Sequence, residues 1–147
     1  MQNLPGKPDG YLDLVTFYIG DACCGIDILQ VQEINRLVEV TCVPLAPEYV
    51  KGIINLRGQI TTVIDLGKRL GLPSEQKMKF RKNIIVCCEN EFIGLLVDSI
   101  DDVVSAERDH MEKPPLNMNA LQGQYVEAIL KTEKQLISIL NLGEVLG

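Results

Sequence analysis

The sequence lacks the features that a membrane, secreted or nucleic-acid-binding protein requires. No apolar stretch approaches the ~20 residues that a helix needs to cross a bilayer. The start, MQNLPGKPDG, has no apolar centre like that of a signal peptide. Runs of lysine or arginine are absent, and 14 basic residues face 20 acidic ones for a net charge of -6, so a clustered positive surface for nucleic acid is missing. These absences predict a cytosolic protein that does not bind nucleic acid.

Residues suited to catalysis are scarce as well. The single histidine, His110, stands in a polar stretch without a recognisable partner, which is typical of a solvated loop residue. Three aspartates gather within residues 98–102, but their spacing is not that of a calcium loop, and a solvated acidic face explains them. The segment GKRLGL lacks the Lys-Ser/Thr ending of a phosphate-binding loop. The sequence therefore predicts no enzyme, no cofactor and no metal.

Cysteine usage gives no sign of disulfides. An odd number of cysteines without a secretion signal indicates reduced thiols that act as small apolar residues. Neither vicinal pair has the two-residue gap of a zinc site. Structural thiols are expected, and a cysteine-based redox or metal-binding protein is the alternative from a different class. The five are Cys23, Cys24, Cys42, Cys87 and Cys88.

The remaining composition is that of a globular β protein. Hydrophobic residues make up 46% and charged residues 23% of 147 residues, which suits one domain or two small modules. Stretches rich in β-branched and aromatic residues, such as residues 11–20, predict strands, and GIINL followed by QITTVIDL predicts a hairpin. Short helices are expected at Pro47 and over residues 66–71. Strands dominate, so we predict small β-barrels rather than a layered α/β fold.

The second half of the chain repeats the first. Residues 49–70, YVKGIINLRGQITTVIDLGKRL, align without a gap with residues 125–146, YVEAILKTEKQLISILNLGEVL. Upstream, GIDILQVQEI aligns with GLLVDSIDDV. Each copy is too small to bury a stable core by itself, so the two should pack together. They can exchange a strand at their boundary. The predicted division is a flexible tail at 1–10, a first barrel subdomain at 11–75 and a second at 76–147.

The repeat supplies an internal comparison for the turn Asn55-Leu56-Arg57-Gly58. The second copy closes the same turn with Lys131-Thr132-Glu133-Lys134, without a glycine and with glutamate in place of arginine. The fold therefore does not demand NLRG. Either Gly58 supplies a positive φ and Arg57 is merely solvated, or Arg57 is placed there for a partner.

Glu33 favours the second interpretation of Arg57. Val31 and Glu33 are two residues apart in a predicted strand and should share one face, which gives an apolar spot beside a carboxylate. If Arg57 approaches that face, the result is a charged rim next to an apolar patch, the layout of a protein-binding site. The second copy has Asp102 and Glu133 at these positions, both acidic, so no such pair forms there. The two modules should bind different partners.

From Tyr11 to Leu146 the chain resembles the CheW family, the coupling proteins of bacterial chemotaxis. The resemblance is carried by GIDILQVQEI, PLAPEYVKGIINLRGQI, VIDL and GLLVDSIDDV, in that order. It implies a mainly β fold of two intertwined five-stranded SH3-like barrels with short helices. It also implies a non-catalytic adaptor that links the cytoplasmic tip of methyl-accepting chemoreceptors to the regulatory domain of the histidine kinase CheA, itself a CheW-like fold.

Matched positions carry the expected roles of single residues. The resemblance implies receptor binding at Val31, Glu33 and Arg57, and kinase binding at Gly94 and Ile100. The outer face of the first module is expected to meet a second copy of the regulatory domain, which closes alternating rings. The resemblance further implies a bacterial cytoplasmic protein that is recruited to receptor arrays at the inner membrane and is a monomer outside them.

One alternative has the same fold. The chain can be a module excised from a longer protein, either the CheW-like half of a CheV protein or the regulatory domain of a CheA kinase. The start at Met1 and the short end after Leu146 favour a free-standing adaptor. The chain departs from the family pattern in the turn at residues 89–91, which lacks glycine, and in several apolar positions occupied by cysteine.

Overall fold

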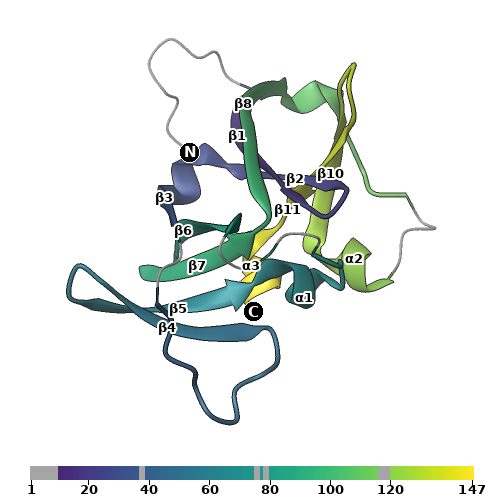
Figure 1. Ribbon diagram of the computed structural model, residues 1–147. Helices are drawn as coiled ribbons and strands as arrows, with labels where there is room; N and C mark the ends of the chain where they lie inside the picture. Colours follow the sequence, from purple (N-terminus) through teal and green to yellow (C-terminus); the bar gives the residue numbers. More distant parts are fainter. Residues whose placement is uncertain (1–9, 37–38, 75–76, 78–79, 116–119) are drawn as a thin grey trace.

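The structure is a computed structural model that describes residues 10–36, 39–74, 77, 80–115 and 120–147 (Figure 1). Two β-sheets and a few short helices make up these residues, which confirms the prediction of a mainly β fold. Most of the predicted N-terminal tail, residues 1–9, lies outside the described residues. Within the described parts, none of the helices has the length and apolar character that crossing a membrane requires.

Each sheet contains strands from both halves of the chain. The chain leaves the first sheet through a short 3-10 turn, η1 (Ile28–Gln30), and enters the second at β3. The two sheets are therefore intertwined. The boundary between residues 75 and 76 separates the two copies of the sequence repeat, but each sheet contains strands from both sides of it. The larger sheet contains, in spatial order, β8 (Ser99–Glu107), β1 (Tyr11–Ile19), β2 (Ala22–Asp27), β11 (Leu136–Leu140), β10 (Val126–Lys131) and the two-residue β9 (Met111–Glu112). The smaller contains β3 (Val31–Arg36), β6 (Lys82–Cys88), β7 (Glu91–Val97), β5 (Gln59–Asp65) and β4 (Val50–Leu56).

The strand registers show that the two sheets are built on the same ladder. In the antiparallel β1–β2 hairpin Thr16 lies opposite Gly25, and in the β6–β7 hairpin Ile85 lies opposite Gly94, each 69 positions further along. Each hairpin also pairs in parallel with a strand of the longer repeat, β2 with β11 and β7 with β5. The repeat seen in the sequence is thus a repeat of strand pairing, and equivalent positions can be compared residue by residue.

The main hydrophobic core lies between the sheets and is shared by them. Phe17 of the larger sheet and Ile84 of the smaller belong to one cluster of buried side chains, and both are fully buried. The helices α1 (Leu66–Leu70) and α3 (Leu142–Leu146) contribute Leu66 and Leu142 to the same cluster. Full burial of such a side chain stabilises the fold by about 1.5–3 kcal/mol. Because both sheets supply the core, neither is expected to be stable without the other.

Arg69 of α1 links the two copies of the repeat. Its guanidinium lies 4.6 Å from the ring centre of Tyr49 and 5.2 Å from that of Tyr125, and these two tyrosines are repeat equivalents. The Nε of Arg69 donates to the carbonyl oxygen of Val145 at 2.8 Å, and Nη2 donates to that of Gly147 at 3.0 Å. Stacked on two aromatic faces and bonded to the last carbonyls of α3, the arginine holds the end of the chain in place.

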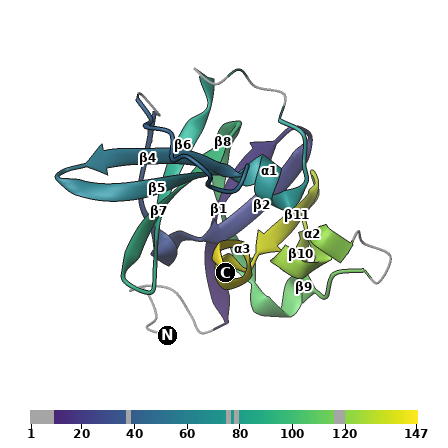
Figure 2. The same cartoon turned by 90° about the horizontal axis from the view of Figure 1, so that it is seen from below.

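The β4–β5 hairpin extends away from the body of the molecule (Figures 1 and 2). Ahead of it, the helix predicted at Pro47 is wrong. The chain makes a turn there instead, in which the backbone N–H of Val50 donates to the carbonyl oxygen of Pro47 at 2.9 Å. The chain then enters β4 directly, and the hairpin places its tip beside β3.

Candidate functional site

The tip of the β4–β5 hairpin presents Arg57 in an unfavourable backbone conformation. The two central residues of the turn, Arg57 and Gly58, have φ angles of 53° and 83°, which is the left-handed pattern of a two-residue hairpin turn. Gly58 adopts this conformation freely, and its N–H donates to Oδ1 of Asn55 at 2.8 Å. A left-handed arginine costs about 1–2 kcal/mol. An arginine at such a position, with its side chain 78% exposed, is consistent with a role in binding.

Arg57 pairs with Glu33. Nη1 of Arg57 lies 2.5 Å from Oε1 of Glu33, so the structure brings these two predicted residues together. Glu33 belongs to β3 and Arg57 follows β4, and these strands are the two opposite edges of the smaller sheet. The ion pair therefore joins the edges of a curled sheet.

Glu33 has a second hydrogen-bond donor on its other oxygen. Nδ2 of Asn35 donates to Oε2 of Glu33 at 3.0 Å. The hydrogen bond from Asn35 is the main reason that the pKa of Glu33 lies below its ordinary value, and Arg57 lowers it further while partial desolvation opposes both. A lowered pKa means that the carboxylate is ionised at neutral pH. The pairing is fully present at neutral pH and is lost only as the pH falls through that lowered pKa.

Val31 does not share a face with Glu33, so that prediction is wrong. Val31 lies opposite Val86 and Glu33 lies opposite Ile85, and these neighbours in β6 point to opposite faces. A β-bulge between Val31 and Glu33 causes the change, because one extra residue in β3 reverses the alternation. Val31 is half-buried and packs against the main core. Its predicted contact with a receptor stays a prediction.

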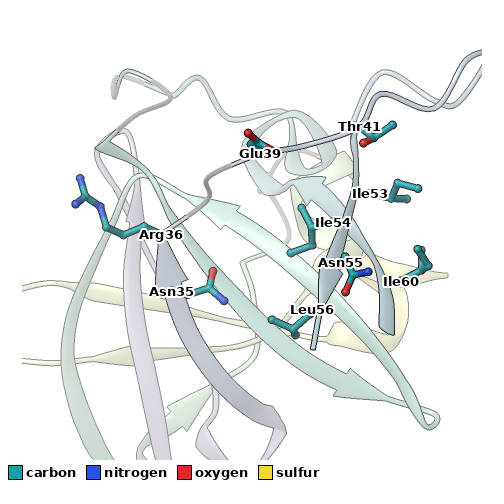
Figure 3. Close-up of a pocket in the computed structure, with 9 residues that line it drawn as sticks. All are labelled: Asn35, Arg36, Glu39, Thr41, Ile53, Ile54, Asn55, Leu56 and Ile60. Carbon is teal, nitrogen blue, oxygen red and sulfur yellow. The ribbon is translucent and has the colours of Figure 1, made fainter. Parts of the chain in front are cut away.

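A groove of mixed polar and apolar lining, which sequence reasoning missed, lies between β3 and β4 (Figure 3). Its volume is about 570 Å³. Figure 3 shows Ile54 and Leu56 of β4 turned toward Asn35 of β3, the same asparagine that bonds Glu33. Alongside, Ile60 is 64% exposed. The signal in the sequence was the apolar run GIINL, whose strand lies at a sheet edge and cannot bury both faces. The lining residues are Asn35, Arg36, Glu39, Thr41, Ile53, Ile54, Asn55, Leu56 and Ile60.

The two residues expected to bind the kinase lie elsewhere. Gly94 is buried in β7 of the smaller sheet, opposite Ile85 of β6 and Val63 of β5. Ile100 is half-buried in β8 of the larger sheet and packs against the main core. The structure therefore does not bring them together with Glu33 and Arg57, and their role in kinase binding stays a prediction.

The single histidine lies on the surface beside a carboxylate. His110 follows β8 in the 3-10 turn η3 (Arg108–His110), and its side chain is 69% exposed. Its Nε2 lies 3.0 Å from Oε2 of Glu107, whose other oxygen accepts the hydroxyl of Tyr11 at 2.7 Å. Among the described residues, no group of three or more histidine, cysteine or acidic side chains is arranged to hold a metal.

The buried thiols should be unreactive in the folded protein. Cys24 is 2% exposed, and burial raises its pKa to about 12, so its nucleophilic thiolate is negligible at pH 8. Cys42 is exposed. We expect a thiol-specific reagent at pH 8 to label Cys42 within minutes and Cys24 only after denaturation, as measured by mass spectrometry of peptides. Rapid labelling of Cys24 in the native protein, or stoichiometric zinc in the purified protein, would support a redox or metal-binding function instead.

Comparison with known proteins gives consistent matches. The model of the CheW-like domain family matches residues 13–147. The chemotaxis protein CheW of Bacillus subtilis is 32% identical over 133 residues, which cover 90% of this chain and 85% of that protein. The chemotaxis protein CheW of Treponema pallidum is 29% identical over 138 residues, covering 91% of this chain and 81% of that protein. The crystal structure of the scaffolding protein TtCheW from Thermoanaerobacter tengcongensis superposes with a TM-score of 0.80 and 36% identity, over 88% of each chain.

Proposed function

This chain belongs to the CheW-like domain family, and on that premise we propose that it is a non-catalytic chemotaxis adaptor that couples chemoreceptor tips to the regulatory domain of the kinase CheA. One observation supports the proposal beyond family membership: the Glu33–Arg57 ion pair lies beside a groove that exposes apolar side chains of β4 and Ile60. The equivalent residues of the second copy, Asp102 and Glu133, are both acidic and cannot pair. A site that is present in only one of two equivalent sheets supports a distinct partner for that sheet.

Two partners on separate surfaces explain how an adaptor without catalysis transmits a signal. We assign the receptor to the surface around Val31, Glu33 and Arg57. The resemblance to the family places the kinase near Gly94 in the smaller sheet and Ile100 in the larger one. If each partner binds better in one arrangement of the assembly, a change at the receptor shifts the kinase by the difference in binding free energy. The protein would act in the bacterial cytoplasm, join receptor arrays at the inner membrane, and be a monomer outside them.

Reversing the charge of Arg57 tests the assigned receptor surface. Arg57→Glu places a second carboxylate beside Glu33 and should weaken binding of an isolated receptor tip at least tenfold, because the assigned surface loses its cation and gains a like charge. Binding of the kinase regulatory domain should stay within twofold. Surface plasmon resonance with each partner measures both affinities.

A matched control comes from the equivalent hairpin of the other sheet. Lys134→Glu makes the same change of charge in the turn that aligns with NLRG, and it should leave receptor affinity within twofold. Equal loss of receptor and kinase binding in Arg57→Glu would show that the two surfaces are assigned wrongly. Loss of receptor binding in both variants would show that net charge, not the site, governs the interaction.

A further inference from the structure

A line of amide side chains leads from the ion pair into the interior of the smaller sheet. Asn35 donates to Glu33, and Oδ1 of Asn35 accepts a long hydrogen bond from Nδ2 of Asn83 at 3.4 Å. The two asparagines lie directly opposite each other on β3 and β6, so they share a face of the sheet. Asn83 is fully buried. The orientation of Glu33 at the surface is therefore connected to a side chain that has no contact with solvent.

Gly94 provides the space that Asn83 occupies. A Cβ atom built on Gly94 would lie 2.5 Å from Oδ1 of Asn83 and 3.0 Å from its Nδ2. Because Asn83 is buried, its amide would have to turn within the interior of the sheet. Oδ1 of Asn83 also accepts no hydrogen bond from the described residues, so the bond that Nδ2 donates to Asn35 is the hydrogen bond that orients the amide. An alanine at position 94 would push the amide from the position in which it supports Asn35.

The larger sheet shows that the fold does not need these amides. Its residues equivalent to Asn83 and Asn35 are Leu14 and Val104, which face each other in the same register. Leu14 is fully buried, and its side chain would lie 3.6 Å from a Cβ atom built on Gly25, the equivalent of Gly94. Leucine and valine fill the same positions without a buried polar atom, whereas a buried amide with an unsatisfied oxygen is unfavourable. Stability alone therefore does not explain the two asparagines.

We propose that Asn83 and Asn35 are positioning residues that hold the Glu33 carboxylate for Arg57 and thereby set the receptor-binding geometry, and that Gly94 acts on this same site by leaving room for Asn83. The inference rests on the proposed receptor-binding function. The resemblance implied kinase binding at Gly94. The proposal assigns Gly94 to the receptor side of the protein instead. The positions of this network are polar in the smaller sheet and apolar in the larger one, as expected of residues that serve only one partner.

Transplanting the larger sheet's own residues tests the positioning role. The double variant Asn35→Val/Asn83→Leu should melt at the same temperature as the native protein or higher. It should nevertheless bind the receptor tip about tenfold more weakly or worse, since a hydrogen bond to a charged group is lost. Affinity for the kinase regulatory domain should not change. A merely structural role predicts the reverse, a lower melting temperature and an unchanged receptor affinity, and that result would overturn the proposal.

A carboxyl titration separates positioning from receptor binding. Carbon-13 NMR of Glu33 should show the pKa of its carboxyl rising toward the ordinary glutamate value in the double variant. This variant still contains Arg57, the charged group that pairs with Glu33. An unaltered Glu33 titration overturns the positioning role. If the titration moves but neither the double variant nor Arg57→Glu changes receptor affinity, positioning stands and the proposed function fails.

Gly94→Ala tests the route through Asn83, with Gly25→Ala as its matched control. Both substitutions crowd an equivalent buried position, but Gly25 faces a methyl group of Ile137 at 3.1 Å rather than an amide. Gly94→Ala alone should weaken receptor binding severalfold. In an Asn83→Ala background, where the collision is gone, Gly94→Ala should have no further effect. Additive effects, or weakened kinase binding without weakened receptor binding, would show that Gly94 acts by another route.

Discussion

Replacing Arg81 by methionine is expected to lower the free energy of unfolding by about 3–5 kcal/mol, the typical cost of removing one partner from a buried ion pair. Nη1 of Arg81 lies 3.0 Å from Oδ2 of Asp65, and Nε lies 3.7 Å from Oδ1 of Asp98. The three side chains are only 14%, 7% and 8% exposed. Without the guanidinium, two carboxylates share a poorly solvated site and repel each other. This repulsion destabilises the folded state but not the unfolded one.

The cluster around Arg81 also joins the two sheets, which adds to the expected loss. Oδ2 of Asp98 accepts the backbone N–H of Gly20 at 2.7 Å, and the N–H of Asp98 donates to the carbonyl oxygen of Tyr18 at 3.0 Å. These bonds attach the end of β7 to the β1–β2 hairpin of the larger sheet. Asp65 accepts the N–H of Lys68 at 3.2 Å and so caps α1. A displaced carboxylate would weaken these contacts as well.

Urea denaturation measures the effect, and Lys68→Met is the control. Lys68→Met also removes one positive charge, but the ion pair of Lys68 with Glu48 spans 3.8 Å between side chains that are 51% and 88% exposed. Such a surface pair contributes about 0–1 kcal/mol. If Arg81→Met unfolds within ~1 kcal/mol of the native protein, or no more readily than Lys68→Met, the carboxylates are better solvated than their burial indicates.

The repeat and the hairpins could be predicted because their signals are local. β-branched residues, turn glycines and a gapless alignment of residues 49–70 with 125–146 each report on neighbours in the sequence. The crossing from one sheet to the other could not be located, since η1 depends on a single cap, in which the N–H of Leu29 donates to Oδ1 of Asp27 at 3.0 Å. The bulge after Val31 was equally invisible, because alternation in the sequence assumes an uninterrupted ladder.

Local composition is misleading at two places for a shared reason. A proline followed by glutamate suits a helix start, yet the chain at Pro47 makes only a turn, because β4 begins at Val50 and leaves no room for a helix. Residues 109–124 are polar and contain two adjacent prolines, as is typical of a loop, but they include β9 and the start of α2 (Ala120–Tyr125). In both places tertiary pairing decides the structure, and local propensity is a weak guide to it.

The candidate site was predictable where the repeat offered a comparison. Arg57 and Glu33 stood out because their equivalents are acidic, and the structure places them in contact. Asn35 and Asn83 did not stand out, since a lone asparagine in an apolar strand has no recognisable partner until the register is known. Extending the comparison to Leu14 and Val104 would have identified both asparagines.

Gly52→Ala is expected to lower the free energy of unfolding by about 3 kcal/mol or more, through a collision with backbone. Gly52 lies in β4 with φ of 152°, and a Cβ atom there would be 2.4 Å from the carbonyl oxygen of Thr41. Thr41 cannot simply move away, because its N–H and carbonyl both bond to Ile53, at 2.9 and 2.8 Å. Relief therefore requires breaking this bridge or distorting β4 at its bulge.

Gly58→Ala, at the tip of the same hairpin, separates the collision from the backbone preference. Its φ is 83° and no atom lies within 4 Å of a built Cβ, so it should cost only about 1 kcal/mol. Thermal and urea denaturation of both variants give the difference. Since Thr41 and Ile53 line the groove, Gly52→Ala should also weaken receptor binding more than Gly58→Ala does. Equal stabilities would mean that the segment at Thr41 yields easily, and the bridge would then not define that wall of the groove.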